Sequence, residues 1–105
     1  MKESDQVLFE LRFYEISAGQ GDRMIKRFKT VSAPLFERYG GEVVGAWTSA
    51  ESDRIFAFML RFDDSSSRDE IWEKYHNDPL FIEARAEQKQ IIESGTSTLL
   101  RAVEL

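Results

Sequence analysis

The chain has 105 residues, of which 42% are hydrophobic, and it carries a formal net charge of −5 with no cysteine. This length predicts one domain over residues 1–105, which buries roughly two-thirds of its unfolded surface and folds on its own core. The lack of cysteine excludes disulfides and thiolate sites, and the acidic balance argues against a nucleic-acid partner. No run approaches the roughly 18 apolar residues of a membrane helix, and the start of the chain is too acidic for a signal peptide. We therefore expect a cytoplasmic protein with no membrane partner.

The first predicted element is a strand over residues 7–16. Its odd positions from 7 to 13 are all apolar, whereas its even positions include Glu10, Arg12 and Tyr14. A period of two with one apolar face is typical of a strand. Glu10, Arg12 and Tyr14 therefore share one side of this strand.

A helix is predicted from Asp22 to Tyr39, because apolar residues recur there every three or four positions. The glycine pair at residues 40–41 ends it, since glycine adopts the left-handed conformation at no steric cost. Pro34 removes one backbone donor inside this stretch, so we expect a kink or a weak turn near it. The charged run 23–29 is interpreted as a solvated helix face.

Two adjacent strands are predicted next, over residues 42–49 and 54–62. The first is rich in valine, and the second places Phe56, Phe58 and two further apolar residues on one face. About four polar residues separate the strands, and this spacing is typical of a hairpin.

The C-terminal part of the chain predicts two short helices and a strand. Residues 64–67 offer several caps for the first helix, among them a Ser-x-x-Glu capping box at Ser67. Asp78-Pro79 starts the second, with aspartate as the cap and proline at the first helical position, and Gly95 closes it. Residues 96–105 alternate loosely and predict the last strand.

The element order is therefore β-α-β-β-α-β, with the second helical element split in two. This order predicts an α+β, ferredoxin-like fold, whose antiparallel sheet is covered by helices on one face only. Several strands carry large apolar residues on both faces, so a monomer would expose an apolar patch. We expect a second copy to pack sheet against sheet in a homodimer.

Several stretches along the chain carry a family resemblance. They are Glu10–Tyr14, Tyr39–Trp47, Phe62–Asp64 followed by Arg68 and Trp72, and Asp78–Phe81. Together they resemble the NIPSNAP family over residues 7–105. The resemblance implies a dimeric α+β barrel, in which two ferredoxin-like domains close their sheets around a central space. The same superfamily includes cofactor-free monooxygenases of antibiotic biosynthesis, muconolactone isomerases, haem-dependent enzymes and stress-responsive proteins. The resemblance implies no catalytic residues.

Glu10, Arg12 and Tyr14 form the first candidate site. If the apolar side of their strand packs on helices, these three residues face the barrel. There they would act as a proton acceptor, an anion clamp and a hydroxyl donor around a small molecule. The alternative interpretation is an internal ion pair of Glu10 with Arg12, Arg61 or Arg101, because buried charges are normally paired.

Further ligand-binding candidates lie on the other predicted strands. Arg61 and Arg101 fall among apolar residues, and an arginine in such a place pairs with a carboxylate or awaits an anionic ligand. Trp47 is interpreted mainly as a core or interface residue, although Gly45 beside it leaves room for a pocket. Trp72 is likewise assigned to the core. The predicted ligand-binding set is Arg12, Tyr14, Trp47 and Arg61.

His76 is the only histidine, and with Tyr14 it is a candidate catalytic residue. Its alternative role is a surface residue at a helix C-terminus. One histidine without cysteine gives no spacing for a metal site, and a haem would have only His76 as an obvious axial ligand. We therefore expect neither a metal nor another cofactor.

Three functions remain open from the sequence. The first is binding of a small apolar or anionic molecule by a NIPSNAP-like homodimer. The second is an enzyme of the cofactor-free monooxygenase or isomerase kind, in which the protein supplies shape, a base and anion stabilisation. The third is a structural or interaction dimer without a ligand.

Overall fold

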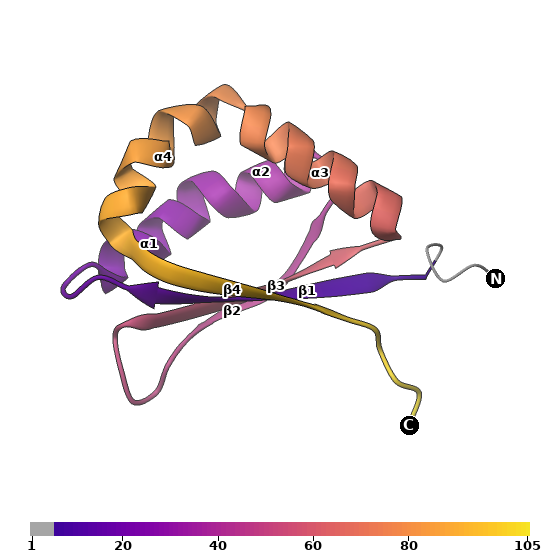
Figure 1. Cartoon of the computed structure of the whole chain (residues 1–105), viewed down its shortest axis with the longest axis horizontal. Helices are drawn as coiled ribbons and strands as arrows, with labels where there is room; N and C mark the ends of the chain where they lie inside the picture. The colour runs from indigo at the N-terminus through magenta and orange to yellow at the C-terminus, as the bar shows by residue number, and fades with distance from the viewer. Residues whose placement is uncertain (1–5) are drawn as a thin grey trace.

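The computed structural model of the chain describes residues 6–105, which form a four-stranded sheet with every helix on one face (Figure 1). Two helical segments lie side by side on this face, one from each half of the chain. The elements are β1 Leu8–Ile16, α1 Gly21–Arg27, the π-helix η2 Phe28–Ser32, α2 Ala33–Arg38, β2 Glu42–Thr48, β3 Ile55–Phe62, α3 Ser65–Asn77, α4 Pro79–Ile91 and β4 Ile92–Leu100.

The strand order is β2-β3-β1-β4, and each neighbouring pair is antiparallel. β1 therefore lies inside the sheet, between β3 and β4, while β2 and β4 form the two edges. The order confirms the predicted α+β, ferredoxin-like fold with its split second helical element. The predicted hairpin is also confirmed, since β2 pairs with β3.

The two faces of β1 are assigned opposite to the sequence-based expectation. Glu10, Arg12 and Tyr14 face the helices, and Glu10 is fully buried opposite Leu60 of β3. The apolar odd side is the open one, where Phe13 is 46% exposed. A strand pattern shows that two faces differ but does not show which of them the helices cover. Here the helices supply polar partners for the charged face.

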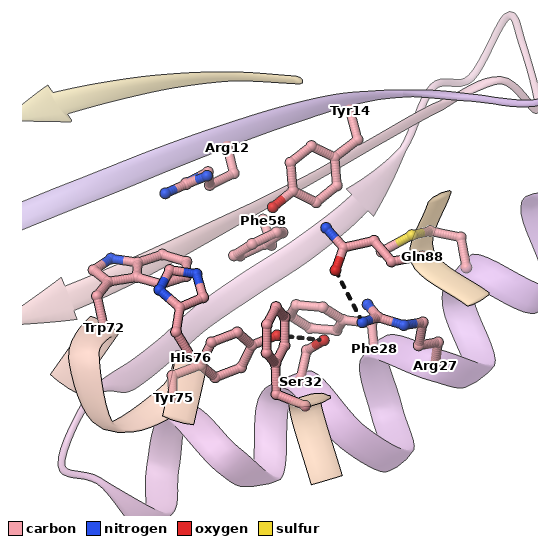
Figure 2. A pocket seen from close by; sticks show the side chains of 12 residues that line it. Arg12, Tyr14, Arg27, Phe28, Ser32, Phe58, Trp72, Tyr75, His76 and Gln88 are labelled. Carbon is pink, nitrogen blue, oxygen red and sulfur yellow. Dashed lines mark hydrogen bonds between the residues drawn. The ribbon is translucent and has the colours of Figure 1, made fainter. Parts of the chain in front are cut away.

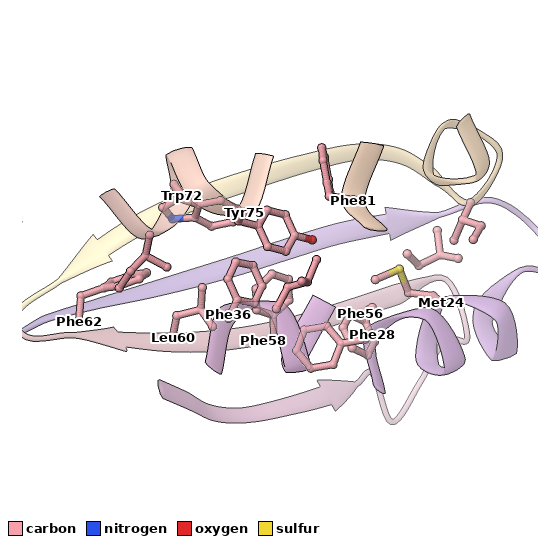
Figure 3. Close-up of a cluster of buried hydrophobic side chains, with 14 residues drawn as sticks. Met24, Phe28, Phe36, Phe56, Phe58, Leu60, Phe62, Trp72, Tyr75 and Phe81 are labelled. Carbon is pink, nitrogen blue, oxygen red and sulfur yellow. The ribbon is translucent and has the colours of Figure 1, made fainter. Parts of the chain in front are cut away.

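An aromatic core fills the space between the sheet and the helices (Figure 3). Phe36 of α2 stacks on Tyr75 of α3 with ring centroids 4.3 Å apart and an interplanar angle of 5°. Phe58 of β3 packs against both Phe28 and Phe36. Such ring pairs add about 0.5–1.5 kcal/mol each beyond the area that they bury. These contacts connect the helical segment of the first half of the chain to that of the second half and to the centre of the sheet.

The first helix contains one wide turn just before its proline. The Ala33 N–H donates to the Phe28 carbonyl, one residue further back than in an α-helix, so η2 is a π-helical turn. Pro34 has no N–H for the Thr30 carbonyl, which is the reason to expect the irregularity here. The wide turn leaves both Phe28 and Ser32 buried on the core side. The helix then ends at Gly40, whose φ is +100°.

In the C-terminal part, the end of α4 and the bounds of β4 differ from those predicted. Of the caps that residues 64–67 offered, α3 uses Asp64, which accepts from the Ser67 N–H at 2.8 Å, whereas Ser67 lies inside the first turn. β4 begins at Ile92, because the chain leaves α4 directly into extended backbone. Gly95 is thus part of β4, where a Cβ atom would lie 2.7 Å from Cδ1 of Tyr14. By contrast, Asp78 caps α4 as predicted, accepting from the Leu80 N–H.

Candidate functional site

A cavity of about 70 Å³ lies between the sheet and the helices (Figure 2). Side chains from six elements converge on it, since α1, η2, α3 and α4 arch over the centre of β1 and β3. The lining residues are Arg12, Tyr14, Met24, Arg27, Phe28, Ser32, Phe58, Trp72, Tyr75, His76, Phe81 and Gln88.

Glu10 is the centre of a hydrogen-bonded cluster beside this cavity. Its carboxylate accepts from Arg12 Nε at 2.8 Å, Arg68 Nε at 2.8 Å, Trp72 Nε1 at 2.9 Å and the Ser97 hydroxyl at 2.8 Å. Burial raises the pKa of Glu10, but the hydrogen bonds from Arg68, Trp72 and Ser97 and the charge of Arg12 together hold this pKa at about 2. Glu10 is therefore an ionised structural carboxylate and not a proton acceptor at neutral pH.

The cluster also fixes the position of Arg12. Its guanidinium carbon lies 4.4 Å from the centroid of the Trp72 ring while Nε donates to Glu10. The predicted ion pair of Glu10 with Arg12 is therefore confirmed. Arg68 is a further partner that the sequence did not identify, although Arg68 and Trp72 are four residues apart and so share one face of α3.

Arg27 is the second guanidinium of the cavity, and sequence reasoning missed it. The run 23–29 was expected to be solvated, but Arg27 is only 5% exposed. One of its terminal nitrogens donates to Gln88 Oε1 at 3.1 Å, whereas its buried Nε has no hydrogen-bond partner among residues 6–105. A signal for its burial was present, because Arg27 lies three residues after Met24 and hence on the same helix face.

His76 lies at the exposed side of the cavity. Its ring stacks on Trp72 at 5.4 Å and meets Phe81 edge-on at 5.1 Å. Partial burial and the charge of Arg12 lower the pKa of His76 below its ordinary value of 6.5. The imidazole is therefore neutral at pH 7, and it can accept a proton.

Two tyrosine hydroxyls face the same space. The Tyr75 hydroxyl lies 3.2 Å from the Ser32 hydroxyl, and the Tyr14 ring meets Phe58 edge-on at 5.5 Å. Burial raises the pKa of both tyrosines. Both hydroxyls are therefore neutral donors at physiological pH.

Comparison with known proteins assigns the fold to a family. The NIPSNAP family model matches residues 9–105. The chain belongs to the NIPSNAP family. A search of curated protein sequences found no match.

Solved structures of NIPSNAP proteins share the fold. An uncharacterised NIPSNAP domain protein from Burkholderia xenovorans is 24% identical, with a TM-score of 0.80, covering 91% of this chain and 94% of that chain. A NIPSNAP family protein of unknown function from Agrobacterium tumefaciens is 17% identical, with a TM-score of 0.82 over 93% of this chain and 89% of that chain. A second NIPSNAP protein from A. tumefaciens is 16% identical and reaches a TM-score of 0.84 over 99% and 92% of the two chains. At these identities the likeness concerns the fold alone.

The predicted ligand-binding residues of this NIPSNAP chain do not form one site. Arg12 and Tyr14 line the cavity with His76, but Arg61 lies on the open face opposite Phe9 and pairs with Asp63 at 3.2 Å. Arg61 is thus not a partner of Glu10. Arg101, the other arginine considered for this pairing, lies just beyond the end of β4.

Trp47 also lies away from the cavity. It is 51% exposed opposite Ala57, and its ring covers Gly45, where a Cβ atom would lie 2.9 Å from Cζ2. Trp47 borders two open apolar grooves. One, of about 460 Å³, runs between β2 and the first helix, and the other, of about 520 Å³, lies on the open face of the sheet beside Leu11 and Phe13.

Clusters of metal ligands and membrane-spanning helices were both sought in the described part of the NIPSNAP chain. No group of three or more His, Asp or Glu side chains within residues 6–105 could hold a metal ion. No helix in the same range has the length and apolar composition needed to cross a bilayer.

Proposed function

We propose that this NIPSNAP protein is a homodimer that binds a small apolar or anionic molecule in the cavity between the sheet and the helices of each protomer. The observation that carries the proposal is the convergence of polar groups on one space with aromatic walls: the guanidinium groups of Arg12 and Arg27, the Tyr14 hydroxyl and the His76 imidazole (Figure 2). Binding sites combine apolar walls with a few placed polar groups in this way. The volume of about 70 Å³ is below the roughly 300 Å³ of pockets for drug-sized ligands, so the ligand is a molecule of few atoms.

Two-dimensional NMR of the tryptophan indole N–H groups tests this proposal. Trp72 lines the cavity and Trp47 does not, so a library of small neutral and charged compounds should include binders that shift the Trp72 signal alone. Gln88→Phe fills the cavity from α4 and should abolish such shifts. Gln90→Phe places the same ring on an exposed part of α4 and should leave them unchanged. A library without any binder would favour the third function, a structural or interaction dimer without a ligand.

The apolar open face supports the homodimer. Leu11, Phe13, Ile55 and Met59 lie there on the two central strands, and in Figure 1 no helix of residues 6–105 covers them. A continuous apolar patch on an open sheet face is typical of an interface with another molecule. A second copy meets the same surface with the same residues, as a two-fold contact requires. Sedimentation of a 12.2 kDa monomer at micromolar concentration would contradict the dimer.

Proton-transfer catalysis is a second candidate function, favoured by the neutral imidazole of His76 beside the charge of Arg12. In an isomerase, His76 would take a proton from a carbon acid and return it to another carbon, while Arg12 and Tyr14 stabilise the enolate oxygen. In a cofactor-free monooxygenase, the same carbanion would react with dioxygen. Consumption of dioxygen with a carbon acid small enough for the cavity tests the second reaction. Turnover that is unchanged in both His76→Ala and Tyr14→Phe would remove these residues from the mechanism.

A further inference from the structure

Arg27 is a buried cation without an anionic partner. It is 5% exposed, and no carboxylate among residues 6–105 forms an ion pair with it. Buried guanidinium groups are normally paired, because an unpaired charge is costly to remove from water. In Figure 2, Arg27 and Gln88 lie at one end of the cavity, whereas Arg12 and Trp72 lie at the other. The Arg27 guanidinium therefore lies at the end of the cavity away from Glu10.

Further hydrogen-bond donors surround this end. Gln88 uses its carbonyl oxygen to accept from Arg27, which leaves its amide N–H groups to donate. Ser32 and Tyr75 form a pair of hydroxyls, and one of their two protons remains available whichever group donates to the other. The Arg27 guanidinium, the Gln88 amide and this hydroxyl pair thus provide donors from different helical elements.

The charges of the cavity add up to one positive charge. The lining residues include two arginines and no aspartate or glutamate. Arg12 is paired with the ionised carboxylate of Glu10, and the His76 imidazole is neutral at pH 7. Only the positive charge of Arg27 has no negative partner. A ligand with one negative charge therefore neutralises the cavity, whereas a dianion such as hydrogen phosphate would leave one negative charge in excess.

The volume limits the size of the ligand. A dry cavity of about 150 Å³ accommodates benzene, so a space of about 70 Å³ holds a molecule with fewer heavy atoms than benzene. Met24, Phe28, Phe58 and Phe81 provide apolar walls around the polar end. A short alkyl chain with a single charged group matches both the size and the walls.

We infer that the cavity binds a small monocarboxylate of about three to five heavy atoms, whose carboxylate accepts from the Arg27 guanidinium and the Gln88 amide and whose alkyl end meets the phenylalanines. This assignment rests on the proposed function, because it names the ligand class of the same cavity. Arg27 is its anchor, and it fixes the carboxylate through a charge-assisted hydrogen bond.

Titrations followed by the NMR signal of the Trp72 indole N–H test the class of the ligand. Acetate and propionate, titrated at constant ionic strength, should shift this signal in a saturable way and leave Trp47 unchanged. Acetamide has nearly the same shape without the charge, and it should bind at least about ten-fold more weakly. Valerate should bind more weakly than propionate, because its longer chain exceeds the cavity.

Two variants test whether Arg27 binds the carboxylate of the ligand. Arg27→Gln should weaken acetate binding at least about ten-fold and leave acetamide binding unchanged. Gln88→Glu places a carboxylate beside Arg27 within the chain, so it should abolish acetate binding and raise the melting temperature. Gln90→Glu adds the same charge to an exposed position of α4 and should do neither. Gln88→Glu keeps the test decisive if Arg27→Gln does not fold.

The outcomes distinguish this inference from the function on which it rests. Binding of acetamide as tight as that of acetate, or acetate binding that survives Gln88→Glu, would contradict a carboxylate as the ligand. Either result would still support a cavity that binds small molecules. The absence of a Trp72 shift with every neutral and anionic probe would contradict both.

Discussion

The two faces of the central strand β1 reverse the usual relation between polarity and burial. On the helix-covered face, Glu10 is fully buried and carries a charge, whereas on the open face Phe13 is 46% exposed. Hydrogen bonds make the first arrangement stable, because every charge there has partners. The second arrangement is stable only if another surface covers it. One strand thus shows that a polar face can form the inside of a domain and an apolar face its interface.

The largest expected effect comes from removing the charge at the centre of the covered face. Glu10→Gln leaves Arg12 and Arg68 without their carboxylate inside the protein, so the free energy of unfolding should fall by about 3–5 kcal/mol. Urea denaturation at fixed protein concentration measures this. Glu15→Gln, on the open side of the same strand, should change stability by less than about 0.5 kcal/mol. Equal losses in the two variants would refute the difference between the faces.

Acid should weaken the covered face through the same carboxylate. The pKa of Glu10 is lowered from 4.5 to about 2 in the folded protein, so folding favours its ionised form. Its contribution of about 3 kcal/mol is therefore fully present above pH 4.5 and lost as the pH falls towards 2. Stability measured against pH should show this loss in the natural chain, and Glu10→Gln should show a smaller one. Parallel curves for the two proteins would contradict the assignment.

A charge on the open face should act on association and not on the fold. Phe13→Glu should weaken the proposed dimer by roughly 1.5–3 kcal/mol for each side chain removed from the contact. Sedimentation equilibrium measures the change. Leu80→Glu is a matched control on α4, since Leu80 is 47% exposed and Phe13 46%. Dissociation by Leu80→Glu, or none by Phe13→Glu, would place the interface elsewhere.

The smallest expected effect compares two glycines that lie under aromatic rings on opposite faces. Gly95→Ala puts a Cβ atom against the Tyr14 ring, which packs against Phe58 and cannot move freely, so it should cost about 1–3 kcal/mol. Gly45→Ala meets the ring of the exposed Trp47, which can turn away. In the background of Phe13→Glu, thermal unfolding should show the larger loss for Gly95→Ala, and the reverse order would contradict this account.

The element order was predictable from the sequence because it depends on local patterns. Alternation in β1, the helical spacing after residue 22 and the cap at Asp78 each involve neighbours along the chain. The side of β1 that becomes buried was not predictable in this way. Arg68 and Trp72 lie 58 and 62 residues from Glu10, and no local pattern connects them.

The candidate site was predicted only in part for a similar reason. Arg12, Tyr14 and His76 were identified by residue type, and the structure brings them together. Trp47 and Arg61 were grouped with them because the sequence does not distinguish the two faces of the sheet. Arg27 was missed because it stands in a charged run, although its spacing from Met24 placed it on the buried face.

The single wide turn in the first helix makes the site sensitive to chain length. Each residue of an α-helix advances the side chains by about 100°. Loss of one residue within Phe28–Ser32 would restore regular helix, and it would turn α1 by about this angle relative to α2. Arg27 and the core residue Met24 share one face of α1, so both would then leave their places between the sheet and the other helices. A change of one residue in the length of this turn would therefore disturb the cavity and the core together.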